Sequence, residues 1–97
     1  MSYDMNIGDR EFNYTYNVAA MWYAAKPNVG IRCFYGMTGR EAVKEQRDIQ
    51  TYMEENRETL LEYEPENGWG TFAGALKFVN SLIIASLENP DAVWEGD

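Results

Sequence analysis

The chain has 97 residues, 45% of them hydrophobic, and a formal net charge of −8. This length and composition are typical of one folded domain covering residues 1–97, and they argue against wholesale disorder. The charge argues against direct contact with nucleic acid or with an anionic membrane surface, because both need clustered Lys and Arg.

The first predicted elements are extended. Residues 2–7 alternate loosely and end at the turn signal Gly8-Asp9, so we expect a short strand there. Residues 11–16 alternate again, with three aromatic side chains on one side, and form either a second strand or an extended lead into a helix. Residues 92–95, at the far end of the chain, are β-capable, and we expect them to pair antiparallel with residues 2–7.

A first helix is predicted over residues 17–26. Thr15 or Asn17 can cap its start, and Pro27 ends it because the residue before a proline avoids the α conformation. Residues 29–35 are apolar and β-branched enough for a short strand, with a loop as the alternative.

Two longer helices follow. At Thr38–Glu41 the threonine hydroxyl and the glutamate carboxylate can satisfy free amides reciprocally, which predicts a helix over residues 39–62, with a bend or break at Asn56. Residues 71–88 have the strongest helical period in the chain, and Thr71 can cap their start. The expected fold class is therefore α+β, mainly α: three helices with a small two-stranded antiparallel pairing of the chain termini.

The apolar faces of these helices predict a hydrophobic core. Its expected members are Val18, Met21, Trp22, Ile49, Met53, Leu60, Phe72, Leu76, Val79, Ile83 and Leu87. Three tryptophans and seven tyrosines are more rings than so small a core readily hides. We therefore expect a homodimer, with Trp94 on the terminal strand at the subunit contact.

The side chains available for chemistry are limited. The chain has no histidine and a single cysteine, Cys33. It therefore lacks the commonest general base and the commonest metal ligand, and one cysteine builds neither a zinc site nor an intrachain disulfide. We expect no metal, no cofactor and no enzymatic activity, and the single cysteine favours a reducing cytoplasm.

Two segments carry more polar and aromatic groups than simple connections need. Each lies just before a predicted helix start, where free amides favour an anion and the rings can stack on a ligand. The candidate ligand-binding residues are Asn13, Tyr14, Thr15, Tyr16, Asn17, Asn67, Gly68, Trp69, Gly70 and Thr71. In the competing interpretation these threonines and amides only cap helices or form turns, the tyrosines pack, and the Trp69 ring fills the core.

The same segments carry a resemblance. Asn13-Tyr-Thr-Tyr-Asn-Val18 and Pro65-Glu-Asn-Gly-Trp-Gly-Thr71, together with Gly74-Ala75 and Asn89-Pro-Asp-Ala92, resemble a family of short uncharacterised proteins encoded by bacteriophages, prophages and scattered bacteria. The resemblance implies a phage or mobile-element context and no particular activity. Many members of that family have histidine where this chain has Tyr16, so an activity that depends on that histidine is not expected here.

Two classes of function remain after these exclusions. The leading hypothesis is a small non-enzymatic protein that binds a nucleotide-like or other polar small ligand between the two segments, for example to sequester a defence signal. The alternative is an acidic interaction module or inhibitor whose long charged helix docks on a basic host protein.

Overall fold

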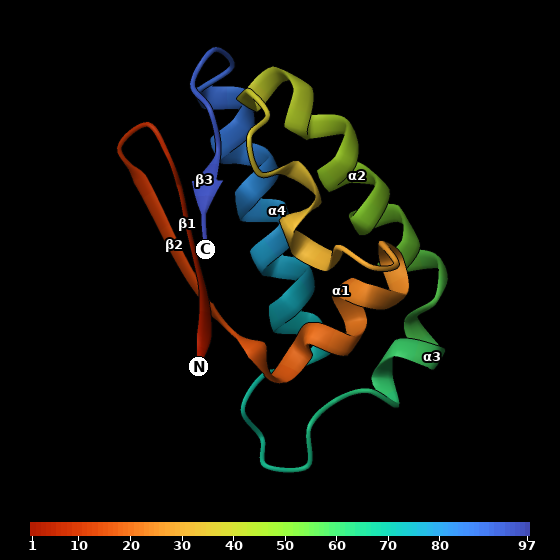
Figure 1. Ribbon diagram of the computed structural model, residues 1–97. Helices are drawn as coiled ribbons and strands as arrows, with labels where there is room; N and C mark the ends of the chain where they lie inside the picture. The colour runs from red at the N-terminus through yellow and green to blue at the C-terminus, as the bar shows by residue number, and fades with distance from the viewer.

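Four α-helices and a three-stranded antiparallel sheet make up the fold, and the computed structural model describes all 97 residues (Figure 1). The fold class is α+β and mainly α, as predicted. In chain order the elements are β1 (Ser2–Ile7), β2 (Arg10–Thr15), the 3-10 helix η1 (Tyr16–Val18), α1 (Ala19–Ala25), the 3-10 helix η2 (Gly30–Phe34), α2 (Gly39–Glu55), α3 (Arg57–Leu61), α4 (Phe72–Glu88) and β3 (Glu95–Gly96).

The sheet has one more strand than predicted. Strands β1 and β2 form a hairpin through Gly8-Asp9, where Gly8 has a φ of 54° that a two-residue hairpin turn favours. The predicted antiparallel pairing of the termini is confirmed on the other edge of β1, where Asn6 faces Glu95. The strand order is therefore β2-β1-β3, with β1 in the centre.

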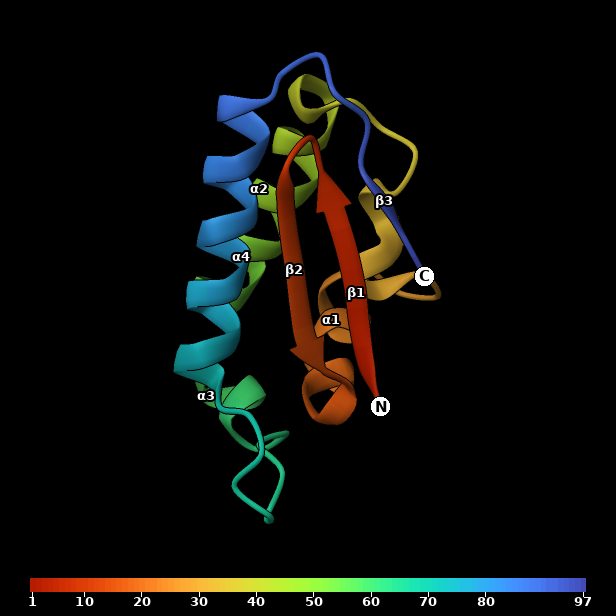
Figure 2. The ribbon, with the colours of Figure 1, turned by 90° about the vertical axis from the view of Figure 1, so that its left-hand side faces the viewer.

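The helices lie on one side of this sheet. Helices α2 and α4 pack against each other, and α4 runs beside the hairpin (Figures 1 and 2). The side chains of Tyr3, Met5 and Ile7 point from β1 into the core and are buried. No element covers the opposite face of the sheet, which faces the viewer in Figure 2.

The capping and break signals around α2 are confirmed. The Thr38 hydroxyl accepts a hydrogen bond from the Glu41 amide, and the Glu41 carboxylate accepts one from the Thr38 amide at 2.9 Å. At the other end, Asn56 adopts a non-helical conformation, and its side-chain nitrogen donates to the Tyr52 carbonyl at 2.9 Å. This bond ends α2, and the short α3 begins directly after it.

The segment 29–35 contains the 3-10 helix η2, over Gly30–Phe34, and no strand. Gly30, with a φ of 61°, starts η2, and the turn directs Ile31 and Phe34 into the core. The strand prediction was wrong because the apolar side chains of this run are buried along one side of a tight helical turn.

None of the helices in the fold is long and apolar enough to cross a membrane.

The predicted core is mostly confirmed, with two departures. Leu76 is only half-buried. The prediction that Leu87 is buried is wrong, because 57% of this residue is exposed on the side of α4 that neither α2 nor the sheet covers. The other nine predicted members are buried.

Trp94 also departs from its prediction, because it is fully buried inside the chain and offers no subunit contact. Its ring nitrogen donates to the Ser86 hydroxyl at 2.9 Å, and that hydroxyl donates to the Gln46 side-chain oxygen at 2.7 Å. The homodimer stays a prediction, now without the ring that was expected at its contact.

Candidate functional site

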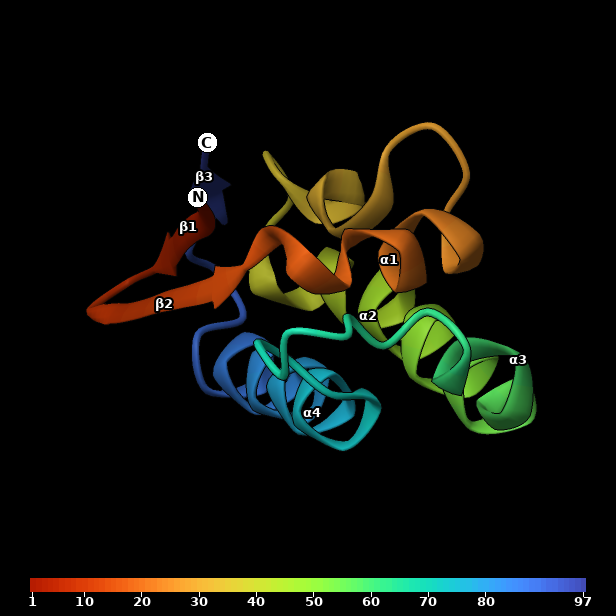
Figure 3. The same ribbon diagram turned by 90° about the horizontal axis from the view of Figure 1, so that it is seen from below.

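The two segments singled out in the sequence meet at one hollow on the surface. It measures about 420 Å³, and its walls come from the start of β1, the end of β2, η1 and the loop before α4. Figure 3 shows this loop running past the start of α1. The residues that line it, called the Trp69 hollow below, are Met1, Ser2, Asn13, Thr15, Tyr16, Asn17 and Trp69.

Gly70 brings the loop against η1. A Cβ placed on this glycine would lie 2.8 Å from Val18 Cγ1 and 3.1 Å from Thr15 Cγ2, too close for any side chain. Its φ of 110° is also one that residues with side chains rarely adopt. The glycine therefore lets the backbone of the loop touch the end of β2, which places Trp69 over the hollow.

Trp69 is the most exposed ring of the chain. Its residue is 70% exposed, whereas Trp22 and Trp94 are completely buried. The Asn67 side-chain oxygen accepts a hydrogen bond from the Trp69 backbone amide at 2.9 Å. This bond stabilises the turn on which the exposed ring lies. The interpretation in which Trp69 fills the core is therefore wrong, and the indole is free to stack on another ring.

Two amide side chains in the Trp69 hollow keep unused hydrogen-bonding groups. The Asn13 nitrogen donates to the Ser2 hydroxyl at 2.8 Å and to Asp4 at 2.6 Å, but its oxygen has no partner within the chain. The Asn17 side chain has no hydrogen bond at all, although its backbone amide donates to the Thr15 hydroxyl at 3.1 Å. The hollow thus offers one free acceptor and one complete free amide group.

Side chains of the chain itself accept hydrogen bonds from amides at the start of α4. At the start of α4, Glu64 accepts the Phe72 amide at 2.6 Å and Thr71 accepts the Gly74 amide at 2.9 Å. The other candidate start is η1, which has only three residues. The start of α4 therefore does not favour an anion, because a carboxylate and a hydroxyl of the chain itself accept hydrogen bonds from two of its first amides.

Five of the ten predicted site residues do not line the hollow. Tyr14 points to the other face of the sheet, where its ring stacks on Phe78 with centroids 4.6 Å apart and burial raises its pKa. Tyr16 lines the hollow, but its hydroxyl accepts a hydrogen bond from Arg32 at 3.0 Å. The remaining four, Asn67, Gly68, Gly70 and Thr71, form the loop turn and the α4 cap.

Sequence reasoning missed the contribution of β1 to this site. Ser2 faces Thr15 across the hairpin, which places its hydroxyl beside Asn13. The signal was present, because a two-residue turn at Gly8-Asp9 fixes the pairing of every residue in the hairpin.

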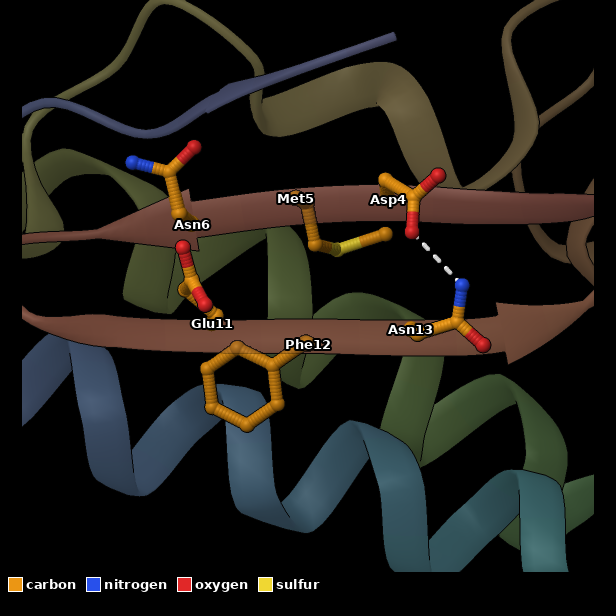
Figure 4. Close-up of a pocket in the computed structure, with 6 residues that line it drawn as sticks. All are labelled: Asp4, Met5, Asn6, Glu11, Phe12 and Asn13. Carbon is orange, nitrogen blue, oxygen red and sulfur yellow. Dashed lines mark hydrogen bonds between the residues drawn. The ribbon is translucent and has the colours of Figure 1, made fainter.

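A second hollow of about 420 Å³ lies on the uncovered face of the hairpin (Figure 4). Asp4 and Asn6 contribute from β1 and Glu11 and Asn13 from β2, with Met5 and Phe12 between them. Asp4 and Asn13 face each other across the strands and are hydrogen-bonded. This face carries carboxylates and amides but no Lys or Arg, because Arg10 points to the other side and pairs with Glu88 at 2.9 Å.

Comparisons with known proteins add no further constraint on the site, since no protein family, no curated protein and no solved structure matches the chain.

Proposed function

We propose that this chain is a small non-enzymatic binding protein that takes a planar, polar ligand of the nucleobase type in the Trp69 hollow. The single observation that carries the proposal is the exposed Trp69 ring beside the unpaired amide of Asn17. The indole supplies a stacking surface, and the amide supplies a donor and an acceptor side by side. Nucleobase edges present the matching pattern of donors and acceptors.

The site favours the base of such a ligand over its phosphate. No Lys or Arg is among the residues that line the hollow, and Glu64 already occupies the first amide of α4. The net charge of −8 adds long-range repulsion of anions. We therefore expect nucleosides, or nucleotide-derived signals whose bases are accessible, to bind at least as well as simple monophosphates.

The biological setting of this proposal comes from the sequence resemblance. In a phage or mobile element, a protein that binds a nucleotide-derived molecule without changing it could sequester a host defence signal. Such a role needs no catalytic group, in keeping with a hollow lined by amides, hydroxyls, Met1 and one indole. The single cysteine favours the reducing cytoplasm of a host cell as the proposed location of this role.

Tryptophan fluorescence gives a direct test. Trp69 is the only exposed tryptophan, so acrylamide reaches it and not Trp22 or Trp94. The chain is titrated with adenosine, guanosine, cytidine and uridine, and with their 5′-monophosphates. We expect at least one nucleoside to change the emission and protect it from acrylamide. If no nucleoside or nucleotide does so up to millimolar concentration, the proposal is wrong.

Matched variants locate the site. Base stacking on an aromatic side chain is worth about 1–3 kcal/mol by alanine substitution, so Trp69→Ala should weaken binding by about 5- to 150-fold. Asn17→Ala should weaken it less. Tyr63→Ala removes another exposed ring of the same loop region, outside the hollow, and should leave binding unchanged. Equal losses in the Trp69 and Tyr63 variants would contradict this location.

A further inference from the structure

The free edge of β2 carries a second inference, independent of the Trp69 hollow. Strand β2 is one of the two outer strands of the sheet, because the order is β2-β1-β3. In an antiparallel pair, residues that hydrogen-bond to the partner strand alternate with residues whose N–H and C=O groups point away from it. The hairpin turn pairs Ile7 with Arg10, and the Tyr16 amide bonds to the Met1 carbonyl at 3.3 Å. With these pairs fixed, the backbone groups of Glu11 and Asn13 point away from β1.

Nothing in the fold uses these outward backbone groups. No other element exchanges a backbone hydrogen bond with Glu11 or Asn13, and no side chain bonds to their amides. An unpaired row of N–H and C=O groups is a template for one more strand. Figure 2 shows no strand beside this edge, and α4 lies to the left of β2 in that view.

The side chains on the two faces of this edge differ in character. The uncovered face carries Asp4 and Glu11 with neutral polar neighbours and no cation (Figure 4). The other face lies toward α4 and carries the half-buried rings of Phe12 and Tyr14. An added strand alternates its side chains between these two faces, so it needs cations on one and apolar groups on the other.

Charge decides between the occupants of this edge. A second copy of the chain would bring another net charge of −8. It would also place its own uncovered face beside the uncovered face of the first copy, and the only charged residues on each are acids. Like charges beside each other in a sheet are destabilising. An extended segment in which Lys or Arg alternates with β-branched residues fits both faces. Its cations lie on the acidic face, and its apolar side chains lie on the face toward α4.

We propose that the β2 edge binds an extended basic segment of a protein partner as a fourth strand of the sheet. Backbone hydrogen bonds to Glu11 and Asn13 hold the segment in register. Its cationic side chains lie toward Glu11 and Asp4, and its apolar side chains lie toward α4. This surface differs from the long charged helix that the sequence suggested for a basic partner.

The test uses the full chain and a synthetic peptide of alternating Lys and Val, seven residues long with blocked ends. Amide hydrogen exchange is measured by NMR with and without the peptide. We expect the exchange of the Glu11 and Asn13 amides to slow on binding, while a peptide of alternating Glu and Val has no effect. Unchanged exchange at these two amides overturns the proposal.

Three variants separate the edge from general acidity. Glu11→Lys should weaken peptide binding about fivefold at low salt, in the range of an exposed ion pair. Glu11→Pro removes an outward N–H and should abolish the added strand, with melting and circular dichroism checking that the hairpin survives. Glu55→Lys makes the same charge change at the exposed end of α2 and should leave binding unaltered. Equal losses in the two lysine variants overturn the proposal.

Two further measurements distinguish other occupants. If the Glu11 and Asn13 amides are protected in the chain alone at high concentration, with a dimer mass in sedimentation, a second copy occupies the edge and the proposal fails. Trp69→Ala should bind the peptide normally. Failure of the nucleoside titrations therefore leaves this inference standing, and failure of the peptide experiment leaves the Trp69 hollow standing.

Discussion

Trp94 and Trp69 occupy opposite environments at the two ends of the fold. Trp94 packs between Phe34 and Phe12, with ring centroids 5.0 and 5.8 Å away, and its ring nitrogen has a buried hydroxyl partner. Trp69 lies on a loop between two glycines with 70% of its surface exposed. A tryptophan beside other rings and a hydrogen-bond acceptor stabilises the fold, whereas one isolated on a turn is available to a ligand.

The largest expected effect tests this contrast by truncation. Trp94→Ala should lower the free energy of unfolding by about 3–5 kcal/mol, because it removes a buried ring and leaves a cavity. Trp69→Ala should change it by less than about 0.5 kcal/mol, as for an exposed position. Urea unfolding followed by circular dichroism measures both. Similar losses in the two variants would remove the distinction between a structural and an available ring.

The next effect concerns the contact that positions Trp69. Gly70→Ala should cost about 1–3 kcal/mol, because the new Cβ meets Val18 and the backbone has a positive φ. Gly68→Ala is the matched control, since Gly68 also has a positive φ but has no atom within 4 Å of an added Cβ. It should cost less. Thermal melting ranks the two, and an equal cost would show that the contact with Val18 is unimportant.

The cap of α4 should contribute less. Thr71→Ala removes the hydroxyl that accepts the Gly74 amide at 2.9 Å and should lower stability by about 1 kcal/mol. Thr71→Ser retains the oxygen and should recover most of the loss. If the serine variant is as unstable as the alanine variant, the threonine methyl group and not the cap stabilises this end.

The smallest effect at neutral pH is expected for Cys33, a half-buried residue of η2. Burial raises the pKa of its thiol from 9.0 to about 11. The unfolded chain therefore loses this proton before the folded chain does, so stability should fall as the pH rises from 9 toward 11. Cys33→Ala should reduce this alkaline loss while Trp69 emission stays unchanged. Identical alkaline profiles of wild type and variant would assign the loss to other groups.

The sequence predicted best the elements whose signals are local. The α2 capping box and the break at Asn56 depend on side chains within a few residues of the backbone groups they bind. The period of α4 correctly identified most of its buried residues. It also predicted burial on a side of the helix that no other element covers, because periodicity does not say how many neighbours a helix has. Leu87 is exposed for that reason.

The errors concern residues whose partners lie far away in the chain. The burial of Trp94 depends on Phe34 and Ser86, which no local pattern connects to it. In the candidate site, the alternation of residues 11–16 already indicated that Tyr14 faces away from Asn13. What could not be predicted was the hydrogen bond from the Phe72 amide to Glu64, a residue outside both segments.

The pairing of β1 with β3 also determines how the chain responds to force. These strands run antiparallel, and Met1 and Asp97 lie at the same end of the pair, where the Asp97 amide bonds to the Asp4 carbonyl at 3.1 Å. A load applied between the two termini therefore opens the hydrogen bonds of this ladder one after another instead of shearing them together. The next residue to bear the load is Trp94, whose ring anchors the detached strand to α4 through Ser86.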